Sequence, residues 1–331
     1  MSPHLVRRRI AATVVSAVVV VAGVAGWVVS PWGPSRLAAQ PSGPVVLATG
    51  AATGLSDRYG LALAGSSDDR LGAVRTLVTA GSQENLDRLV QGDASFALAT
   101  ADVVEEYLAT RPPAREIRAV ARLYDSYVHL VVPAHKEVHR LADLRGQRVA
   151  VGVPGSGDGL AADRVLAAAG LNPATDVTRL ELGPDAAVAA LATGSIDAYL
   201  MVDGIPSPQL EQLTNERLVD LADVAEALLG SGTCPRPVCA VYHAGTVPAT
   251  TYPGLAVAIT TVAVPTLLLT TTEVGDDVVR QFTKLVFDTA PRIAAAIPAA
   301  RQIDRRSAIF TGPVPLHDGA RYYYRAAKVA V

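Results

Sequence analysis

The sequence has few of the residues that nucleic-acid binding requires. Its 331 residues include 29 Lys and Arg against 31 Asp and Glu, which gives a formal net charge of −2. The one basic run is Arg7-Arg8-Arg9. Because binding to phosphates needs a cationic face, this balance argues against a nucleic-acid partner.

Cysteine is almost absent. The two that occur, Cys234 and Cys239, stand close together in the segment CPRPVC. In an oxidising compartment two such cysteines favour a small disulfide-closed loop. A zinc site is the alternative, but no further ligands with suitable spacing are evident nearby. We therefore expect a structural disulfide and no metal.

Several catalytic motifs are missing as well. No Gly-x-Ser-x-Gly elbow and no P-loop occur, and the glycine-containing loop TGAATG at 49–54 does not match the dinucleotide-binding fingerprint. HKEVH, from His135 to His139, has its glutamate two positions after the first histidine, whereas a zinc-protease helix has it one position after. This segment follows Pro133 and is predicted to be a surface loop. We expect no enzymatic activity and no cofactor.

One long apolar run is present near the N-terminus. Residues 10–29 carry no charge and follow the three arginines. Their length reaches the roughly 20 residues that a membrane span needs, beyond the usual 7–15 of a signal-peptide core. We predict a basic cytoplasmic segment at 1–9, a signal or membrane-anchor helix at 10–29 and a linker at 30–43. An uncleaved anchor is favoured over a cleaved signal, and both place the rest of the chain outside the cytoplasm.

The remaining chain alternates short apolar runs with helical patterns. This alternation predicts an α/β fold with mostly parallel sheets. Ser82 is the expected N-cap of one helix, and Asp102 with Glu105 forms a capping-box pattern for the next. The predicted strands are 45–48, 96–99, 128–132, 149–153 and 198–202, and the predicted helices are 86–90, 161–169, 186–192 and 278–287.

Three turns between a strand and a helix carry glycine and hydroxyl side chains. They begin at Thr49, Thr79 and Val153. The free N–H groups of a helix N-terminus hold small anions without any covalent chemistry. Three such turns in one chain indicate a receptor for a solute that bears a carboxylate.

Five segments, in this order, resemble the TAXI family of extracytoplasmic solute receptors, which serve TRAP transporters. The resemblance covers about 45–325, and the segments are ATGAATG, TAGSQENLDRLVQGDASFALATADV, VHLVVPAHKEVHRLADLRGQRVAVGVPGSGD, LATGSIDAYLMVDGIPSP and PLHDGARYYYR. It implies a type II periplasmic-binding-protein fold, with two α/β lobes joined by two crossing strands near 128–133 and 259–265. Lobe 1 would comprise 44–130 and 262–331, and lobe 2 would comprise 131–261.

The same resemblance implies which residues contact the ligand. The first loop departs from the family's usual G-G-x-Y-Y-P pattern, and Tyr124 is expected to cover the ligand. Asp158 and Asp203 stand where the family usually has threonine and a small residue. The implied ligand-binding residues are Thr53, Gly54, Thr79, Gly81, Ser82, Thr100, Asp102, Tyr124, Ser156, Gly157, Asp158 and Asp203.

The two additional acids change the ligand that we expect. At an effective dielectric constant near 20, like charges about 4 Å apart repel by roughly 4 kcal/mol, which corresponds to about a thousandfold in affinity. The ligand therefore carries an amine or is less anionic than a dicarboxylate, or else one acid pairs with Arg58 or Arg122.

The resemblance implies an extracytoplasmic receptor that binds a small carboxylate or a glutamate-like amino acid between its lobes. It would deliver this solute to the membrane permease of a TRAP-type transporter. A membrane-anchored sensory or regulatory binding protein with the same fold is the alternative, and an anchored N-terminus suits it. An enzyme ranks below both, because no nucleophile–base pair, metal cluster or cofactor lysine is evident.

Overall fold

The computed structural model describes residues 44–67, 71–112, 115–230, 238–312 and 314–329. The predicted cytoplasmic segment, anchor helix and linker lie outside these residues, and so does Cys234, one of the two cysteines of the expected disulfide. Among the described residues, no helix combines the length and the apolar character that crossing a membrane requires.

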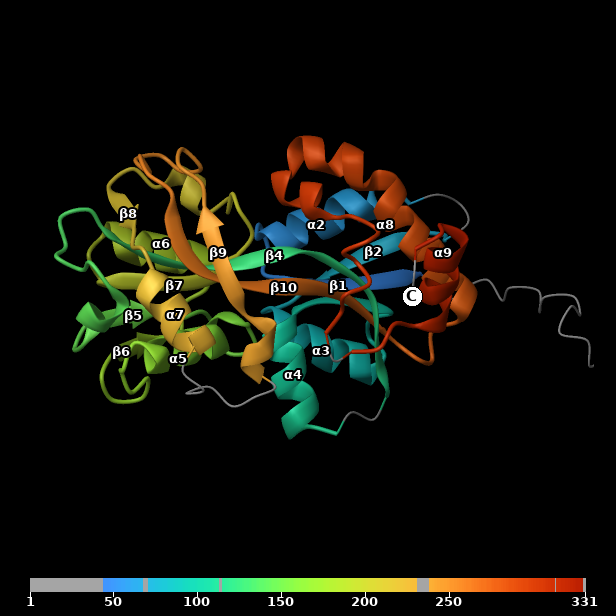
Figure 1. Ribbon diagram of the computed structural model, residues 1–331, viewed down its shortest axis with the longest axis horizontal. Coiled ribbons are helices and arrows are strands. Elements are labelled where there is room, and N and C mark those ends of the chain that lie inside the picture. The colour runs from blue at the N-terminus through green and yellow to red at the C-terminus, as the bar shows by residue number, and fades with distance from the viewer. Residues whose placement is uncertain (1–43, 68–70, 113–114, 231–237, 313, 330–331) are drawn as a thin grey trace, which may run out of the picture. The chain divides into compact units, whose positions relative to one another are not determined.

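The first lobe is built on three parallel strands (Figure 1). β1 (Val45–Gly50) pairs on one side with β2 (Val74–Val78) and on the other with β3 (Phe96–Thr100). β3 is buried along its whole length, as is typical of strands in a parallel sheet that helices cover on both faces.

Two long strands run through both lobes. β4 (Ile117–Pro133) and β10 (Ile259–Thr271) are antiparallel to each other and lie at the centre of the strand order β2-β1-β3-β10-β4-β7-β5-β6. β4 begins at Ile117, before the predicted crossing at 128–133. The expected lobe boundaries fall within these two strands, and the assignment of residues to lobes stays a prediction.

The second lobe carries the remaining strands. β7 (Ala198–Asp203) pairs antiparallel with β4 and parallel with β5 (Arg148–Ala150), which in turn pairs with β6 (Thr178–Leu180). Two short strands extend this lobe: β8 (Glu216–Leu218) lies beside β4, and β9 (His243–Val247) lies beside β10.

The sheet is mixed, so the expectation of mostly parallel sheets is wrong. Parallel pairs occur at the two flanks, whereas β10 is antiparallel to β3, β4 and β9. The reason is the crossing itself: β4 and β10 connect the lobes in opposite directions, which apolar patterns in single segments do not reveal.

Helices cover both faces of the sheet in the first lobe (Figure 1). α2 (Leu55–Ala64), α8 (Asp276–Ala296) and α9 (Asp318–Ala326) share one apolar cluster. α3 (Ser82–Gln91) and α4 (Ala101–Thr110) belong to a second cluster on the opposite face. The apolar side chains of β1 and β3 alternate between these two clusters.

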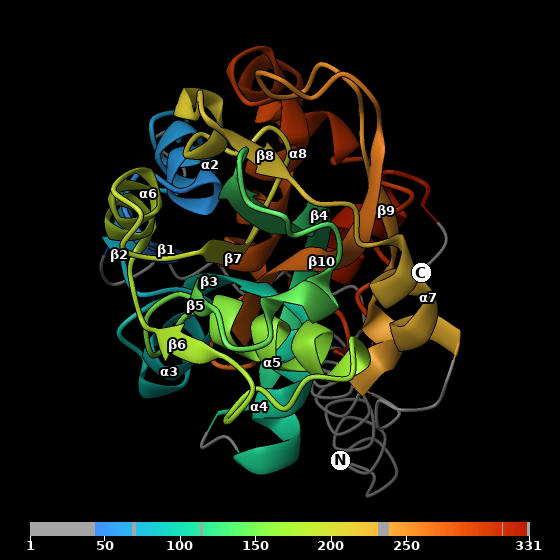
Figure 2. The same ribbon diagram turned by 90° about the vertical axis from the view of Figure 1, so that its left-hand side faces the viewer.

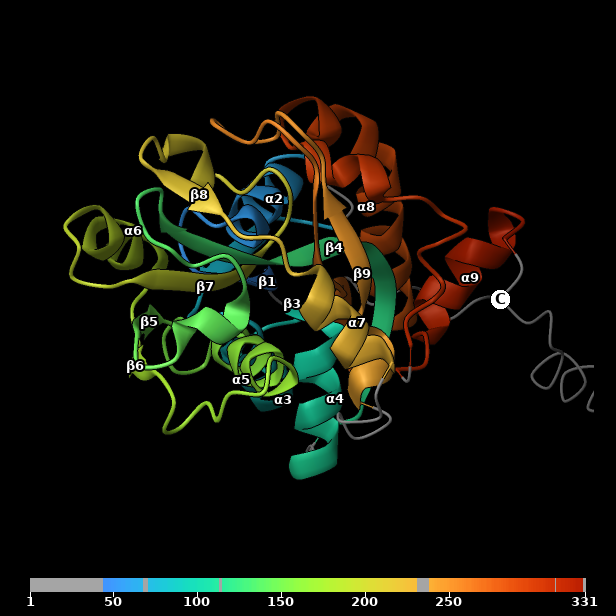
Figure 3. The same cartoon turned by 60° about the vertical axis from the view of Figure 1, so that its left-hand side comes forward.

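The second lobe is covered in the same way. α6 (Pro184–Ala192) packs in its own apolar cluster on one face. α5 (Asp158–Ala168) and α7 (Ala222–Gly230) lie on the other face and join the cluster that contains α3 and α4, as Figures 2 and 3 show. The short 3-10 helices are η1 (Leu141–Leu144), η2 (Leu210–Gln212), η3 (Val238–Val241) and η4 (Pro298–Gln302). One continuous core therefore underlies both lobes.

The ring of Phe282 on α8 fixes this helix against β3. It is fully buried and stacks on Phe96, with ring centroids 4.0 Å apart. We expect Phe282→Ala to lower the free energy of unfolding by about 3–5 kcal/mol, because it removes buried contacts and leaves a cavity. Urea denaturation of the purified protein measures this.

Phe310 provides the matched control, because its side chain is 67% exposed. Phe310→Ala should change the free energy of unfolding by less than about 0.5 kcal/mol. Equal losses in the two variants would contradict the view that α8 is held by the Phe96–Phe282 stack.

Candidate functional site

A cavity of about 100 Å³ lies where the two lobes meet. The N-termini of α2, α3, α4 and α5 all contribute to its wall, at Gly54, Gly81, Thr100 and Gly157 respectively. Because the first N–H groups of a helix have no partner within the helix, these four termini give the wall a positive character.

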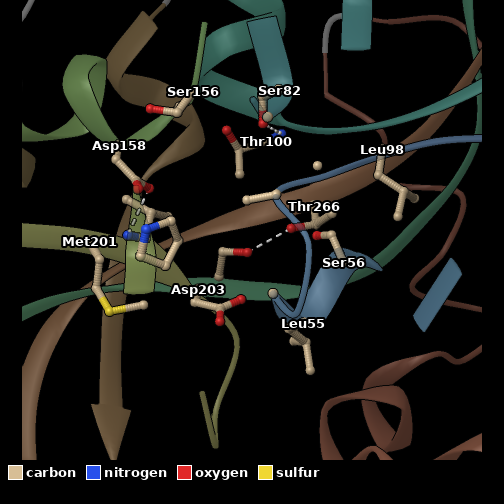
Figure 4. Close-up of a pocket in the computed structure, with 18 of the residues that line it drawn as sticks. Leu55, Ser56, Ser82, Leu98, Thr100, Ser156, Asp158, Met201, Asp203 and Thr266 are labelled. Carbon is tan, nitrogen blue, oxygen red and sulfur yellow. Dashed lines mark hydrogen bonds between the residues drawn. The ribbon is translucent and has the colours of Figure 1, made fainter. Parts of the chain in front are cut away.

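The structure brings together most of the residues that the sequence singles out, although their roles in binding stay predictions. Figure 4 shows Ser82 and Thr100 near each other, Ser156 beside Asp158, and Asp203 apart from that pair. Of the predicted ligand-binding residues, the cavity is lined by Gly54, Gly81, Ser82, Thr100, Ser156, Gly157, Asp158 and Asp203.

Two predicted residues near the N-terminal turns do not line the cavity. Thr53 is exposed and has a positive φ of 68°, so it shapes the turn before α2. The Thr79 hydroxyl donates to Asn85 at 2.6 Å and accepts from the backbone N–H of Gly81 at 3.2 Å. Thr79 therefore holds the α3 turn in place from behind.

Tyr124 does not line the cavity either. Its side chain is buried, and its hydroxyl lies 3.0 Å from that of Ser56, which does line the cavity. The Tyr124 ring faces α2 and packs edge-on against Tyr59, so it stands behind Ser56 and not at the cavity wall, and its contact with a ligand stays a prediction.

Asp102 points away from the cavity and into a polar cluster beside it. Its carboxylate accepts from the Tyr242 hydroxyl at 2.5 Å and lies 3.5 Å from the Arg164 guanidinium. Arg164 also pairs with Glu106 at 3.1 Å. Because α4 carries Asp102 and Glu106 while α5 carries Arg164, the cluster ties the two helices together.

The caps of α3 and α4 differ from the prediction. Gly81, not Ser82, is the N-cap of α3, and the Ser82 hydroxyl accepts from the N–H of Thr100. The N-cap of α4 is Thr100, so Asp102 lies inside the helix and Glu105 cannot complete a capping box. The N-cap therefore lies one residue before the predicted position in α3 and two residues before it in α4.

The α3 turn touches the loop before α5 directly. The N–H of Glu84 donates to the carbonyl oxygen of Gly155 at 3.1 Å. A side chain at Gly81, where φ is +142°, would lie only 3.0 Å from the Cα of Ser156. Glycine is required here, and the two lobes are closed on the cavity.

Several residues that line the cavity are not among those predicted from the sequence. Ser126 of β4 and Thr266 of β10 share a hydrogen bond of 2.7 Å where the crossing strands pass beneath the cavity. Tyr199, Met201 and Gln209 line the second lobe's side. A polar residue in the middle of each apolar crossing strand was the available signal for Ser126 and Thr266.

The cavity wall carries two partly buried acids whose ionised forms are disfavoured. Burial raises the pKa of Asp158 to about 7 and that of Asp203 to about 6, and the charge of Asp203 further raises the Asp158 value. Asp158 accepts from the N–H of Val202, while Asp203 accepts from Gly204 and from the Ser207 hydroxyl. These bonds offset part of the cost of burial.

Neither acid has a cationic partner among the described residues. Arg122 pairs instead with Asp125, at 2.6 Å. Arg58 is exposed, and although its charge slightly lowers the pKa of Asp203, the two form no ion pair. The expected pairing of an acid with Arg58 or Arg122 is therefore not found. No group of three or more potential metal ligands occurs in the described part of the chain.

The cavity wall also carries two polar atoms without partners. The hydroxyls of Ser156 and Tyr199 are buried and make no hydrogen bond within the protein. Since buried polar groups are nearly always paired, these atoms indicate where a bound molecule would supply the missing bonds.

The model of the NMT1-like family matches residues 47–327, which include every element that builds the cavity. The chain belongs to the NMT1-like family. This NMT1-like chain is also similar to solved structures. One described as a periplasmic transporter is 17% identical, with a TM-score of 0.53, over 88% of this chain and 94% of that one.

Two further solved structures resemble it. The alkanesulfonate-binding protein SsuA from Xanthomonas axonopodis pv. citri, bound to MOPS, is 19% identical (88% of this chain, 92% of that chain, TM-score 0.49). The aliphatic sulphonate binding protein SsuA from Escherichia coli is 14% identical (79% of each chain, TM-score 0.45). At these identities the likeness concerns the fold, and the expected two-lobed type II periplasmic-binding-protein fold is confirmed.

Asp158 should make this NMT1-like protein less stable as the pH rises. Below about pH 4 the carboxyl is protonated in both the folded and unfolded chains; between pH 4 and 7 only the unfolded chain ionises, so stability falls. We expect Asp158→Asn to raise the free energy of unfolding by on the order of 2 kcal/mol at pH 8 and to leave it unchanged at pH 4. Urea denaturation at both pH values measures this.

Glu226→Gln is the control, because Glu226 is an exposed acid on α7. It should change the free energy of unfolding at neither pH. A loss of stability in Asp158→Asn at pH 8 would instead mean that the ionised carboxylate stabilises the start of α5.

Proposed function

We propose that this NMT1-like protein is an extracytoplasmic solute-binding protein that encloses a small carboxylate or amino acid between its lobes. The observation that carries the proposal is the convergence of four helix N-termini, together with the hydroxyls of Ser82, Thr100 and Ser156, on one small cavity. Several N–H donors and hydroxyls around one space suit a carboxylate, which only accepts hydrogen bonds.

The binding step follows from the closed contact between α3 and the 153–157 loop. A solute that touches both lobes stabilises this closed arrangement relative to an open one, by as much as its affinity differs between the two. The hinge lies in β4 and β10, because these strands run through both lobes. Closure excludes water, which strengthens each hydrogen bond to the enclosed solute.

The cavity is suited to binding rather than to catalysis. The residues that line it include no histidine, cysteine, lysine or arginine. Its two acids accept hydrogen bonds from neighbouring N–H and hydroxyl groups. We therefore propose that the solute is bound and released unchanged.

At a finer level, we propose a TAXI-type receptor that delivers its solute to a TRAP-type membrane permease. The support is the ordered set of five motifs, which spans nearly the whole region that the family model matches. The apolar segment 10–29 after three arginines supports a membrane anchor with the folded part outside the cytoplasm. The similar structure described as a periplasmic transporter agrees with that location.

A thermal-shift screen of the purified protein tests the binding function. The panel contains small monocarboxylates, dicarboxylates and α-amino acids. A solute present at 100 times its dissociation constant should add about 2.7 kcal/mol to the free energy of unfolding, which corresponds to several degrees in Tm. A panel in which no compound shifts Tm, and none gives heat in calorimetry, would argue against the proposal.

Thr100→Val tests the cavity itself. Thr100 is the N-cap of α4, but its side chain makes no capping bond, so replacing the hydroxyl with a methyl group removes a donor while keeping the shape. We expect affinity for the best solute of the screen to fall about tenfold, the value of one lost hydrogen bond, with Tm of the free protein nearly unchanged. Isothermal titration calorimetry measures this change.

Thr246→Val is the matched control, since Thr246 is exposed on β9 and lies outside the cavity. Its affinity should equal that of the unmodified protein. If Thr100→Val also binds with unchanged affinity, the solute does not occupy the space in front of α4.

A further inference from the structure

Binding of a carboxylate does not explain why two acidic side chains line the cavity. Asp158 and Asp203 both line it, and neither pairs with a cation among the described residues. A carboxylate ligand placed beside them would be repelled. The hydroxyls of Ser82 and Thr100 come from the starts of α3 and α4 in the first lobe, whereas Asp158 and Asp203 come from the start of α5 and the end of β7 in the second. A ligand between the lobes therefore meets hydroxyls from one and carboxylates from the other.

The two acids differ in how fully the protein satisfies them. Asp203 accepts a bond at each oxygen, from the Gly204 N–H at Oδ1 and from the Ser207 hydroxyl at Oδ2. Asp158 accepts one bond, from Val202, through Oδ1. Its second oxygen, Oδ2, has no hydrogen-bond donor among the described residues. Asp158 can therefore accept a hydrogen bond from a ligand at Oδ2.

The Tyr199 hydroxyl independently indicates that a ligand group binds beside these acids. Its side chain is completely buried, it lines the cavity, and its hydroxyl has no hydrogen-bond partner. The carboxylates of Asp158 and Asp203 are close enough to act on this hydroxyl electrostatically. A buried phenol without a partner marks a place where a bound molecule would complete a hydrogen bond, and the nearby carboxylates favour a positively charged group there.

We propose that Asp158, Asp203 and the Tyr199 hydroxyl form a subsite for a protonated amine. The solute is then a small zwitterion, with its ammonium group at this subsite and its carboxylate at the Ser82 and Thr100 hydroxyls and the N-termini of α3 and α4. Asp158 Oδ2 and Tyr199 accept hydrogen bonds from the ammonium group, while Asp203 contributes a second negative charge. The inference rests on the proposed binding function and narrows it to amino compounds.

Matched ligand pairs test the subsite. Each pair shares a carbon skeleton and differs only in having an amine or a hydroxyl: L-alanine with L-lactate, and L-glutamate with 2-hydroxyglutarate. For the pair that binds, calorimetry should give at least 30-fold tighter binding of the amino member. The Asp158→Asn variant should reduce this ratio to below about threefold, mainly by weakening the amino member.

Two other variants complete the design. Tyr199→Phe removes only the hydroxyl and should lower the affinity for the amino member severalfold. If Asp158→Asn does not fold, Tyr199→Phe still tests the proposed subsite. Glu226→Gln, on the exposed surface of α7, should leave both affinities unchanged. Circular dichroism and Tm establish that each variant is folded.

The outcomes separate this inference from the proposed function. Equal binding of hydroxyl and amino members by the unmodified protein overturns the amine subsite but leaves the solute-binding function standing. Binding of no member in either series, when the wider screen also fails, overturns both. The third outcome is that Na⁺ alone raises Tm of the unmodified protein but not of Asp158→Asn, and that amino members bind no more tightly than hydroxyl members. This result would assign the subsite to a metal ion and overturn the proposal.

Discussion

The passage of β4 and β10 through both lobes is the constraint on which the rest of the structure depends. Because these strands are hydrogen-bonded to each other and to the strands on either side, each lobe is built outward from the same pair. The helices that follow β1, β3 and the loop after β5 then point their N-termini at the same space. The Ser126–Thr266 hydrogen bond marks the floor of this space.

The cavity combines two opposing electrostatic features within a small volume. Helix N-termini and hydroxyls attract negative charge, whereas two desolvated carboxylates repel it. Desolvation disfavours the ionised form of both acids, because neither pairs with a cation among the described residues. A dipolar solute would satisfy both ends at once, so the unfavourable burial becomes a source of selectivity.

Contacts outside the cavity complement those within it. The hydrogen bond from Glu84 to Gly155 and the ion pairs of Arg164 with Asp102 and Glu106 join elements from the two lobes. Two kinds of contact therefore stabilise the closed arrangement: those between the two lobes and those that the solute makes with both. The contacts between the lobes range from the almost completely buried pair of Arg164 with Asp102 to the pair of Arg164 with the partly exposed Glu106.

The sequence by itself determined the features that depend on neighbouring residues, namely the strand–turn–helix units and the glycines at the turns, and it also determined membership of the NMT1-like family. The units and turns are local because turn chemistry and helix starts are set within a few residues. Only the tertiary structure decided that Asp102 faces Arg164, that Tyr124 stands behind Ser56, and that Tyr199 reaches the cavity unpartnered. The direction of each of these side chains depends on strand register and on how distant elements pack, and neither is written in the residues beside them.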